Sequence, residues 1–438
     1  DKAAPFLNVS RINQHELLDG LLEAVSDGKD FEWNEILDYI ENIINNEAFW
    51  EDNYQEINYR DWIISRIADI IEEKTRTDNN PFKKELLSKV SGILIKLAEN
   101  ADSELYPMED IVTSVLNSPK GKIYHAMINF LLSYARLYKK NETEKWYDPI
   151  KLSIEKKLDN PLLEFSVVLA EYLRFIYYID KNWVIENIDK IFTDKYWKET
   201  FSGYIIYHAN PIYEEIYNLV KEKEYYDKAI NTDFEDNEVT MSLVYQICSA
   251  YLFDYENLTD NNGLIRKLIE KRNTVQLSEI VRFFLLQKED NFEITKPKIK
   301  PLWNVLFELV SQNPDNFKEF IAEVSRWLVF FDEIDEELFE WIKLSVKYMK
   351  IGPNLFIVED LLNCVEKSPG NVAEIFIEML NNGVYPDYQE ENIQKIVKVL
   401  YECGKKESAN KICNSYGKRN LHFLREVYEE YNEFEVFN

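Results

Sequence analysis

The chain of 438 residues is 46% hydrophobic, so it can bury a sizeable core and cannot be disordered throughout. It carries 79 acidic residues against 51 Lys and Arg, and the net charge of −28 argues against nucleic acid or an anionic membrane as the main partner, because both require a basic surface. Only 11 Gly and 13 Pro occur, and so few turn-forming residues favour long helices over the many short strands of an all-β protein.

Apolar side chains recur at helical spacing along most of the chain. Trp33–Asn46 carries an apolar stripe on one face, which predicts a helix packed on one side. Ile123–Tyr138 and Leu162–Ile179 are apolar nearly all round, which predicts central helices enclosed by neighbours. Polar residues interrupt both segments, so neither is expected to span a membrane. One-sided stripes return in Phe317–Phe330 and Val372–Asn382, and no segment has a convincing strand alternation.

Four Asn-Pro pairs each precede an apolar helical pattern, which fits an Asn cap followed by Pro at the first helical position. The prolines at 81, 119, 161 and 211 are also spaced in a way that loosely matches the helix-pair period of HEAT-type repeats. The four pairs are Asn80-Pro81, Asn160-Pro161, Asn210-Pro211 and Asn313-Pro314.

Other residues mark helix ends in the last part of the chain. Asn371 and Glu374 have the spacing of a capping box, which predicts a helix start. Three apolar patterns are each followed by a glycine that is placed to end the helix. Gly383 is expected to end its helix in the left-handed conformation. The last two patterns predict a helical hairpin. The glycines are Gly383, Gly404 and Gly417, and the hairpin patterns are Ile393–Cys403 and Ser408–Tyr416.

These features predict an all-α fold, a superhelical array of antiparallel helix pairs. The array would be an α-solenoid with degenerate HEAT- or TPR-like repeats, because the Trp-Leu-Gly-Tyr pattern of tetratricopeptide repeats is missing. The polar stretches Asn231–Glu238 and Glu289–Lys300 are the expected breaks in the array. We divide the chain into an N-terminal helical array (residues 1–235) and a C-terminal helical array (residues 236–438).

The sequence has no motif for nucleotide binding or catalysis. The phosphate-binding patterns G-x-x-x-x-G-K-[ST] and G-x-G-x-x-G and the nucleophile pattern G-x-S-x-G are all missing. Gly121-Lys122 lacks the upstream glycine and the Ser or Thr of a P-loop, and is interpreted as a helix start. We therefore predict no catalytic, cofactor-binding or metal-binding residue, no cofactor and no enzymatic activity in this chain.

Histidine and cysteine are too scattered for a metal site. None of the four histidines has another His or Cys three or four residues on, and no C-x-x-C occurs. His125 lies in an apolar helix and is interpreted as a hydrogen-bonded core residue, with a buried functional group as the alternative. All four cysteines lie in apolar helical patterns, which predicts buried, reduced thiols in a cytoplasmic protein. They are Cys248, Cys364, Cys403 and Cys413.

Aromatic residues make up 14% of the chain, with nine Trp, 28 Tyr and 25 Phe. Trp and Tyr are enriched at protein-binding hot spots, although most of these rings must fill gaps between helices. Two tyrosine-rich clusters, 204–208 and 224–227, are the best candidates for a concave protein-binding face. The candidate residues are Tyr204, Tyr207, His208, Tyr225 and Tyr226.

Four local phrases are similar to a known class of protein when taken in order. They are GKDFEWNEILDYIENII (28–44), VLNSPKGKIYHAMINFLLSYARL (115–137), IDKNWVIENIDKIF (179–192) and NPDNFKEFIAEVSRWL (313–328). The order of their Trp, Gly and Pro positions resembles the helical C-terminal region of bacterial antiphage defence proteins, in which a sirtuin-like NADase or a STAND-type NTPase precedes the helical part.

The resemblance implies a sensor region that recognises a phage protein, such as a terminase, portal, tail or capsid component, and controls an N-terminal effector. The chain begins at Asp1 rather than Met, which we expect of a piece from which the effector is missing. We therefore expect a protein partner and expect neither nucleic acid nor a membrane as a partner. An oligomer is compatible with the sequence. The alternatives are a general bacterial TPR- or HEAT-like adaptor and, from another class, an all-helical enzyme.

Overall fold

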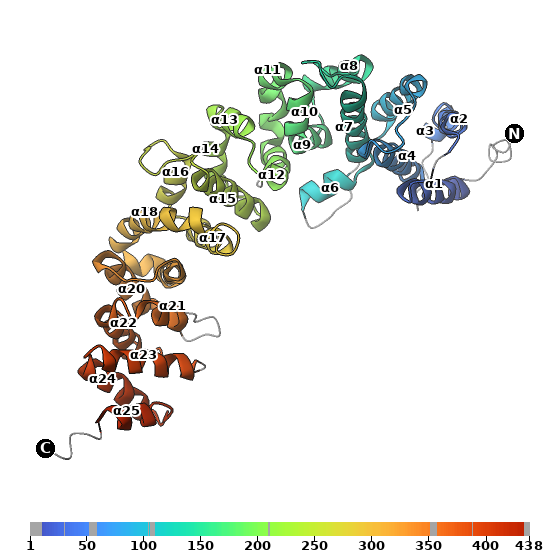
Figure 1. Cartoon of the computed structure of the whole chain (residues 1–438). Coiled ribbons are helices and arrows are strands. Elements are labelled where there is room, and N and C mark those ends of the chain that lie inside the picture. Colours follow the sequence, from blue (N-terminus) through green and yellow to red (C-terminus); the bar gives the residue numbers. More distant parts are fainter. Residues whose placement is uncertain are drawn as a thin grey trace. The chain divides into compact units, whose positions relative to one another are not determined.

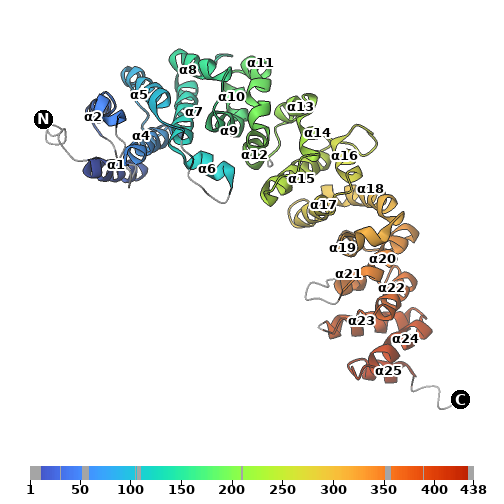
Figure 2. The same ribbon diagram turned by 180° about the vertical axis from the view of Figure 1, so that it is seen from behind.

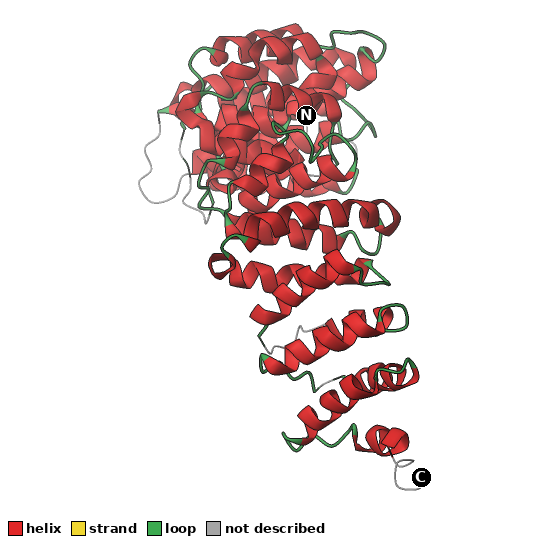
Figure 3. Cartoon of the chain, turned by 90° about the vertical axis from the view of Figure 1, so that its left-hand side faces the viewer, coloured by secondary structure: helices red, strands yellow, loops and turns green. Residues whose placement is uncertain are grey.

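The computed structural model describes residues 11–29, 31–51, 59–103, 105, 110–208, 211–350, 357–387 and 389–432. These residues form 25 α-helices and several short 3₁₀ turns, and they include no strand (Figure 3). The all-α prediction is therefore confirmed. Within the same residues, no helix combines the length and the apolar composition needed to cross a membrane.

The helices fall into two compact units. Unit 1 comprises residues 1–225 with 232–242, and unit 2 comprises residues 226–231 with 243–438. The division predicted at residue 235 stays a prediction. The unit 1 helices are α1 (Arg11–Ser26), α2 (Trp33–Ile44), α3 (Glu47–Trp50), α4 (Tyr59–Arg76), α5 (Leu87–Asn100), α6 (Ile111–Asn117), α7 (Pro119–Tyr138), α8 (Asp148–Leu158), α9 (Leu163–Glu171), α10 (Leu173–Ile179), α11 (Lys181–Ile191), α12 (Trp197–His208) and α13 (Glu214–Glu222), with 3₁₀ turns η2 (Lys84–Leu86) and η3 (Asp194–Tyr196).

Unit 1 consists of two layers of helices. In one layer α1, α4, α7, α9 and α12 pack each on the next, and in the other α2, α5, α8 and α11 do the same (Figures 1 and 2). The apolar stripes face the space between the layers. Helix α2, for example, buries Trp33, Leu37 and Ile40, as its one-sided stripe predicts.

Helix α7 is the central helix of unit 1. Its side chains are buried on nearly every side, which confirms the enclosed helix predicted for Ile123–Tyr138. It begins where Gly121-Lys122 suggested: Pro119 is the first helical residue, and Ser118 Oγ accepts a hydrogen bond from the Gly121 N–H at 3.0 Å. Both features are typical helix starts.

Two glycines allow helices of unit 1 to approach one another closely. A Cβ atom on Gly121 would overlap the carbonyl oxygen of Val115 at the end of α6. A Cβ on Gly203 of α12 would lie 2.8 Å from Cγ1 of Val167 in α9. The contacts of α6 with α7 and of α9 with α12 therefore require glycine at these positions.

Unit 2 is also layered. Helices in one layer pack in the order α17, α19, α21, α23 and α25 (with η5 joining α19 to α21), and α20, α22 and α24 form the other layer. Residues of α14 (Tyr225–Ile230) and α15 (Asn237–Leu252) belong to both units. The remaining elements are α16 (Leu264–Glu270), α17 (Thr274–Leu286), α18 (Phe292–Ser311), η4 (Pro314–Phe317), α19 (Lys318–Val324), η5 (Ser325–Phe330), α20 (Glu336–Tyr348), α21 (Ile357–Cys364), α22 (Pro369–Asn381), α23 (Glu390–Glu402), α24 (Lys406–Gly417) and α25 (Arg425–Asn432).

The helix ends predicted at glycine are confirmed in unit 2. Gly383 and Gly404 have φ angles of 79° and 73°. After α22, the Val384 N–H donates to the Met379 carbonyl at 3.0 Å, and after α23 the Lys405 N–H donates to the Leu400 carbonyl at 2.8 Å. This is the Schellman pattern. Helices α23 and α24 form the predicted hairpin, and α24 ends at Gly417.

The predicted helix starts were mostly wrong. Asn313 does precede the turn η4, and Pro314 is its first residue. Asn80 has a φ of 57° and does not cap a helix. Helix α9 begins only at Leu163, after Asn160-Pro161. Asn210 lies outside the described residues. Asn371 is not part of a capping box, because α22 begins at Pro369 and the Asn371 side chain donates to the Ile334 carbonyl at 2.7 Å.

Three predicted segments also differ in continuity. Leu162–Ile179 is two helices, α9 and α10, because the chain leaves helical geometry at Tyr172. Phe317–Phe330 is helical but tightens into the 3₁₀ turn η5. Glu289–Lys300 is not a break, since α18 begins at Phe292 and continues past Lys300 despite Pro297 and Pro301. This helix buries Ile299, Leu302 and Trp303. The burial of that apolar face outweighs the lost backbone hydrogen bonds.

The cysteine prediction holds for three of the four residues. Cys248, Cys364 and Cys413 are buried and free, and burial raises the pKa of each thiol. Cys403 is exposed, which corrects the prediction. The reason is its position: it follows the last turn of α23, where the apolar stripe has ended.

We predict that Gly121→Ala lowers the stability of unit 1 by at least about 2 kcal/mol, because an added methyl group in a fixed backbone contact forces the helices apart. Thermal unfolding would measure the change. Gly92→Ala is the matched control, since a Cβ at Gly92 meets nothing within 4 Å in the middle of α5 and should leave stability equal or slightly higher. Equal melting temperatures for both variants would contradict the prediction.

Candidate functional site

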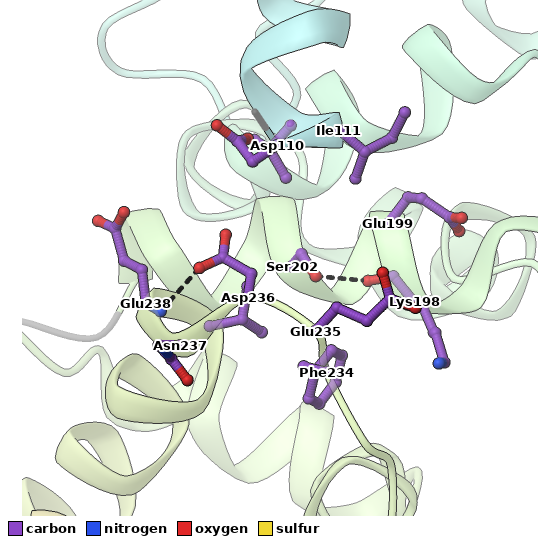
Figure 4. A pocket seen from close by; sticks show the side chains of 12 residues that line it. Asp110, Ile111, Lys198, Glu199, Ser202, Phe234, Glu235, Asp236, Asn237 and Glu238 are labelled. Carbon is purple, nitrogen blue, oxygen red and sulfur yellow. Dashed lines mark hydrogen bonds between the residues drawn. The ribbon is translucent and has the colours of Figure 1, made fainter. Parts of the chain in front are cut away.

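A groove of about 710 Å³ opens in unit 1 between α6, α12 and the segment that leads into α15. Figure 4 shows Asp110 and Ile111 on one side of it and residues 234–238 on the other, with Ser202 of α12 between them. The full lining is Asp110, Ile111, Val112, Lys198, Glu199, Ser202, Phe234, Glu235, Asp236, Asn237, Glu238 and Val239.

Local interactions fix the walls of the groove. Asp110 caps α6, its carboxylate accepting from the Thr113 N–H at 2.6 Å, and Val112 packs with Val115 and with Val167 of α9. On the opposite side, Asp236 accepts from the Glu238 N–H at 2.8 Å (Figure 4). Both turns are caps that acidic side chains favour at helix starts.

The groove is strongly acidic. Five carboxylates line it, against the single ammonium group of Lys198, which donates to the Asp233 carbonyl at 3.0 Å. The apolar part of the lining includes Ile111, which is 40% exposed, and Phe234, which stacks on Phe201. Such a surface complements a basic segment that also carries apolar side chains.

Among the predicted site residues, Tyr207 is the one whose hydroxyl is influenced by the carboxylates of this groove. It is 42% exposed on α12, so a partner can contact its ring. Burial of the hydroxyl raises the pKa of Tyr207 to about 12. Carboxylates add to the rise, Glu171 most and then Glu238 and Asp110 of the groove. The phenol is therefore neutral at physiological pH and can donate a hydrogen bond.

Tyr204 and His208 lie in the core of unit 1 instead of on its surface. Their rings stack with centroids 4.8 Å apart, and both side chains are almost fully buried. His208 Nε2 donates to the Glu171 carbonyl at 2.9 Å, and burial lowers the pKa of His208 to about 4. His208 thus links α12 to α9, and neither side chain presents a surface to a partner.

The structure does not bring Tyr225 and Tyr226 together at one surface. Tyr225 is partly buried in unit 1, where its hydroxyl donates to Asp189 at 2.6 Å and its ring packs on Phe192 and Trp197. Tyr226 is fully buried in unit 2, and its hydroxyl bonds to Gln246. Sequence reasoning selected these residues by type, and burial gives them mainly a packing role.

His125 joins a polar cluster between α4, α7 and α9. Its Nε2 lies 2.8 Å from the Glu171 carboxylate, and its ring contacts Tyr172 edge-on. Asn129 donates to the His125 carbonyl at 3.0 Å and to the Tyr172 hydroxyl at 3.1 Å. Burial by itself would lower the pKa of His125, but the hydrogen bond and the negative charge of Glu171, followed by Glu72 and Asp69, raise it.

No protein-family model matches the chain, and no solved structure matches it either. Within the described residues, no three His, Cys, Asp or Glu side chains are grouped so that they could hold a metal ion.

Sequence reasoning missed the groove residues. Asp110, Glu199 and Glu235 lie on three different elements, and nothing in the order of the chain joins them. One signal was present in the sequence: the polar stretch Asn231–Glu238 carries four acidic residues close together.

We predict that Glu171→Gln lowers the pKa of His125, because the Glu171 carboxylate is the group that raises it most. The sign follows from the raised pKa in the folded protein: the stabilisation is fully present below about pH 6.5, the value of an unperturbed histidine, and is lost as pH rises through the raised value. NMR titration of the four histidines measures the pKa directly, with His125→Gln used for assignment. An unchanged His125 pKa in Glu171→Gln would contradict the pairing.

Proposed function

We propose that this chain is a non-catalytic helical-repeat module that binds a protein partner through the acidic groove of unit 1. The observation that carries the proposal is the lining of the groove, where five carboxylates, an exposed Ile111 and the neighbouring Tyr207 are combined on a rigid helical support. Charged groups at such a surface steer a partner of opposite charge, and apolar side chains supply contact area.

We further propose that the helices form an α-solenoid with degenerate HEAT-like repeats. Support comes from the layering in each unit, in which the helices of one layer each pack on the next helix of that layer. A helix pair of this kind cannot bury its apolar face alone and needs the following pair to do so.

The resemblance of the sequence to the helical region of antiphage defence proteins supports a more specific role. In this proposal the module is the sensor region of a cytoplasmic bacterial defence protein, and its partner is a phage terminase, portal, tail or capsid protein with a basic surface. Binding would control an effector domain that precedes the module. A general bacterial adaptor is the alternative, and a gene that lacks an upstream effector domain would favour it.

Neutralising the groove is expected to weaken partner binding at least about 10-fold and to remove most of its salt dependence, because the groove attracts a basic partner electrostatically. The variant is Glu199→Gln, Glu235→Gln and Glu238→Gln together, which spares the two capping aspartates. Binding would be measured by calorimetry against the phage proteins named above, each purified, at low and physiological salt.

The matched control changes the same charge elsewhere on unit 1, with Glu85, Glu144 and Glu186 replaced by Gln; all three are exposed. If the two triple variants bind a phage protein equally well, the groove is not the docking site. If no phage protein binds the wild-type chain, the sensor role fails and the adaptor alternative gains support.

The solenoid proposal predicts local unfolding. In an array stabilised by neighbour contacts, Gly121→Ala should speed amide hydrogen exchange in α4, α6, α7 and α9 and leave α20, α22 and α24 at wild-type rates. Hydrogen exchange with mass spectrometry resolves these helices. Equal acceleration through all of them would show global cooperativity and contradict the proposal, and Gly92→Ala again serves as the control.

A further inference from the structure

Trp62 is the one exposed tryptophan of this chain, and all nine tryptophans lie within the described residues. Its side chain is 43% exposed on α4, whereas seven others are buried and Trp50 is half-buried. An indole that stays exposed to water forgoes the hydrophobic stabilisation that the seven buried tryptophans contribute to the fold. An isolated exposed tryptophan is a common anchor of protein interfaces.

The Trp62 ring has two aromatic neighbours. His15 of α1 lies 5.4 Å away between ring centroids, and Tyr59, one turn earlier on α4, lies 5.4 Å away in an edge-on contact. A ring that is positioned in advance loses little conformational entropy when a partner covers it. Trp62 therefore offers a preorganised apolar surface.

A hollow of about 370 Å³ adjoins this ring, and its lining differs in charge from the rest of the molecule. None of the six lining residues is acidic, although the chain has 79 Asp and Glu. Two of them, Arg66 and Lys122, carry a positive charge at all physiological pH values. The lining is His15, Trp62, Ser65, Arg66, Asn117 and Lys122.

The charged groups of the hollow are held in place by ion pairs with Asp19 and Asp69, and Asp19 also contacts His15. Lys122 Nζ lies 2.9 Å from the Asp69 carboxylate, and Arg66 contacts both Asp69 and Asp19. An ammonium group has three donors and a guanidinium five, so Lys122 and Arg66 can donate to a further acceptor while these ion pairs stay intact. The hollow thus places fixed donors beside an exposed ring.

We propose that the hollow around Trp62 is a second protein-docking site of unit 1, and that its occupant is a segment with an aromatic side chain next to an Asp or Glu. The aromatic ring packs on Trp62, and the carboxylate accepts from Lys122 and Arg66. Hydrogen-bond complementarity supports this occupant, because Lys122 and Arg66 keep unused donors beside Trp62 and none of the six lining side chains is a carboxylate. The hollow shares no lining residue with the acidic groove and takes a partner segment of the opposite charge.

The test is selection of peptides from a displayed random library against the wild-type chain of 438 residues, followed by affinity measurement with purified chain and synthetic peptide. We expect enriched peptides to combine an aromatic residue with an adjacent Asp or Glu. Trp62→Ala should weaken their binding at least about 30-fold, the loss typical of a tryptophan hot spot, and Trp62→Phe should recover part of it. Lys122→Gln should remove the preference for the acidic residue.

Two controls separate this site from other effects. Tyr178→Ala removes another exposed aromatic ring of unit 1, and it should bind the peptides like the wild type. The triple Gln variant of the acidic groove should also bind them normally, so a failure of the groove proposal leaves this one standing. Circular dichroism and thermal unfolding of each variant report whether it is folded.

Several results would overturn the proposal. They are the absence of any enriched peptide, a basic or purely aliphatic consensus, and binding that Trp62→Ala changes less than about 2-fold. AMP, tested by calorimetry, is the probe for a small planar anion. If AMP binds with Trp62-dependent affinity and no peptide does, the hollow is a small-ligand site and not a protein-docking site.

Discussion

The enclosure of α7 is the constraint on which most of unit 1 depends. In a helix that is buried on nearly every side, polar side chains need partners inside the protein. His125 therefore pairs with Glu171, and Asn129 bonds to the Tyr172 hydroxyl. The same enclosure leaves no room for a side chain at Gly121, where α6 ends against the start of α7. Polar residues and a glycine on one helix thus determine how four helices meet.

The two docking surfaces proposed for unit 1 lie beside the short helix α6. Ile111, at its start, lines the acidic groove, and Asn117, at its end, lines the hollow beside Trp62. The two surfaces differ in charge, one with five carboxylates and one with none. A helix of seven residues, whose Val112 and Val115 pack on Val167 of α9, therefore separates the two proposed docking surfaces.

The sequence was sufficient for the helical class and for many helix positions, because apolar spacing follows directly from which face is buried. It failed where tertiary contacts overrule local preference. Tyr172 breaks an apolar run because the chain turns there and its hydroxyl meets Asn129. Asn371 has the spacing of a cap but bonds to Ile334 in another turn. Binding residues were harder still, since exposure decides them: Tyr204 and Trp62 are equally aromatic, yet only Trp62 reaches solvent.

The exposed Cys403 has a practical consequence for following this protein in solution. Burial raises the thiol pKa values of Cys248, Cys364 and Cys413, so these side chains are both shielded and protonated at neutral pH. A maleimide dye added to the native chain would therefore attach first at Cys403, just beyond α23, without any engineered substitution. A single fluorophore on unit 2 would then report by anisotropy when a large partner joins the chain, whichever surface that partner occupies.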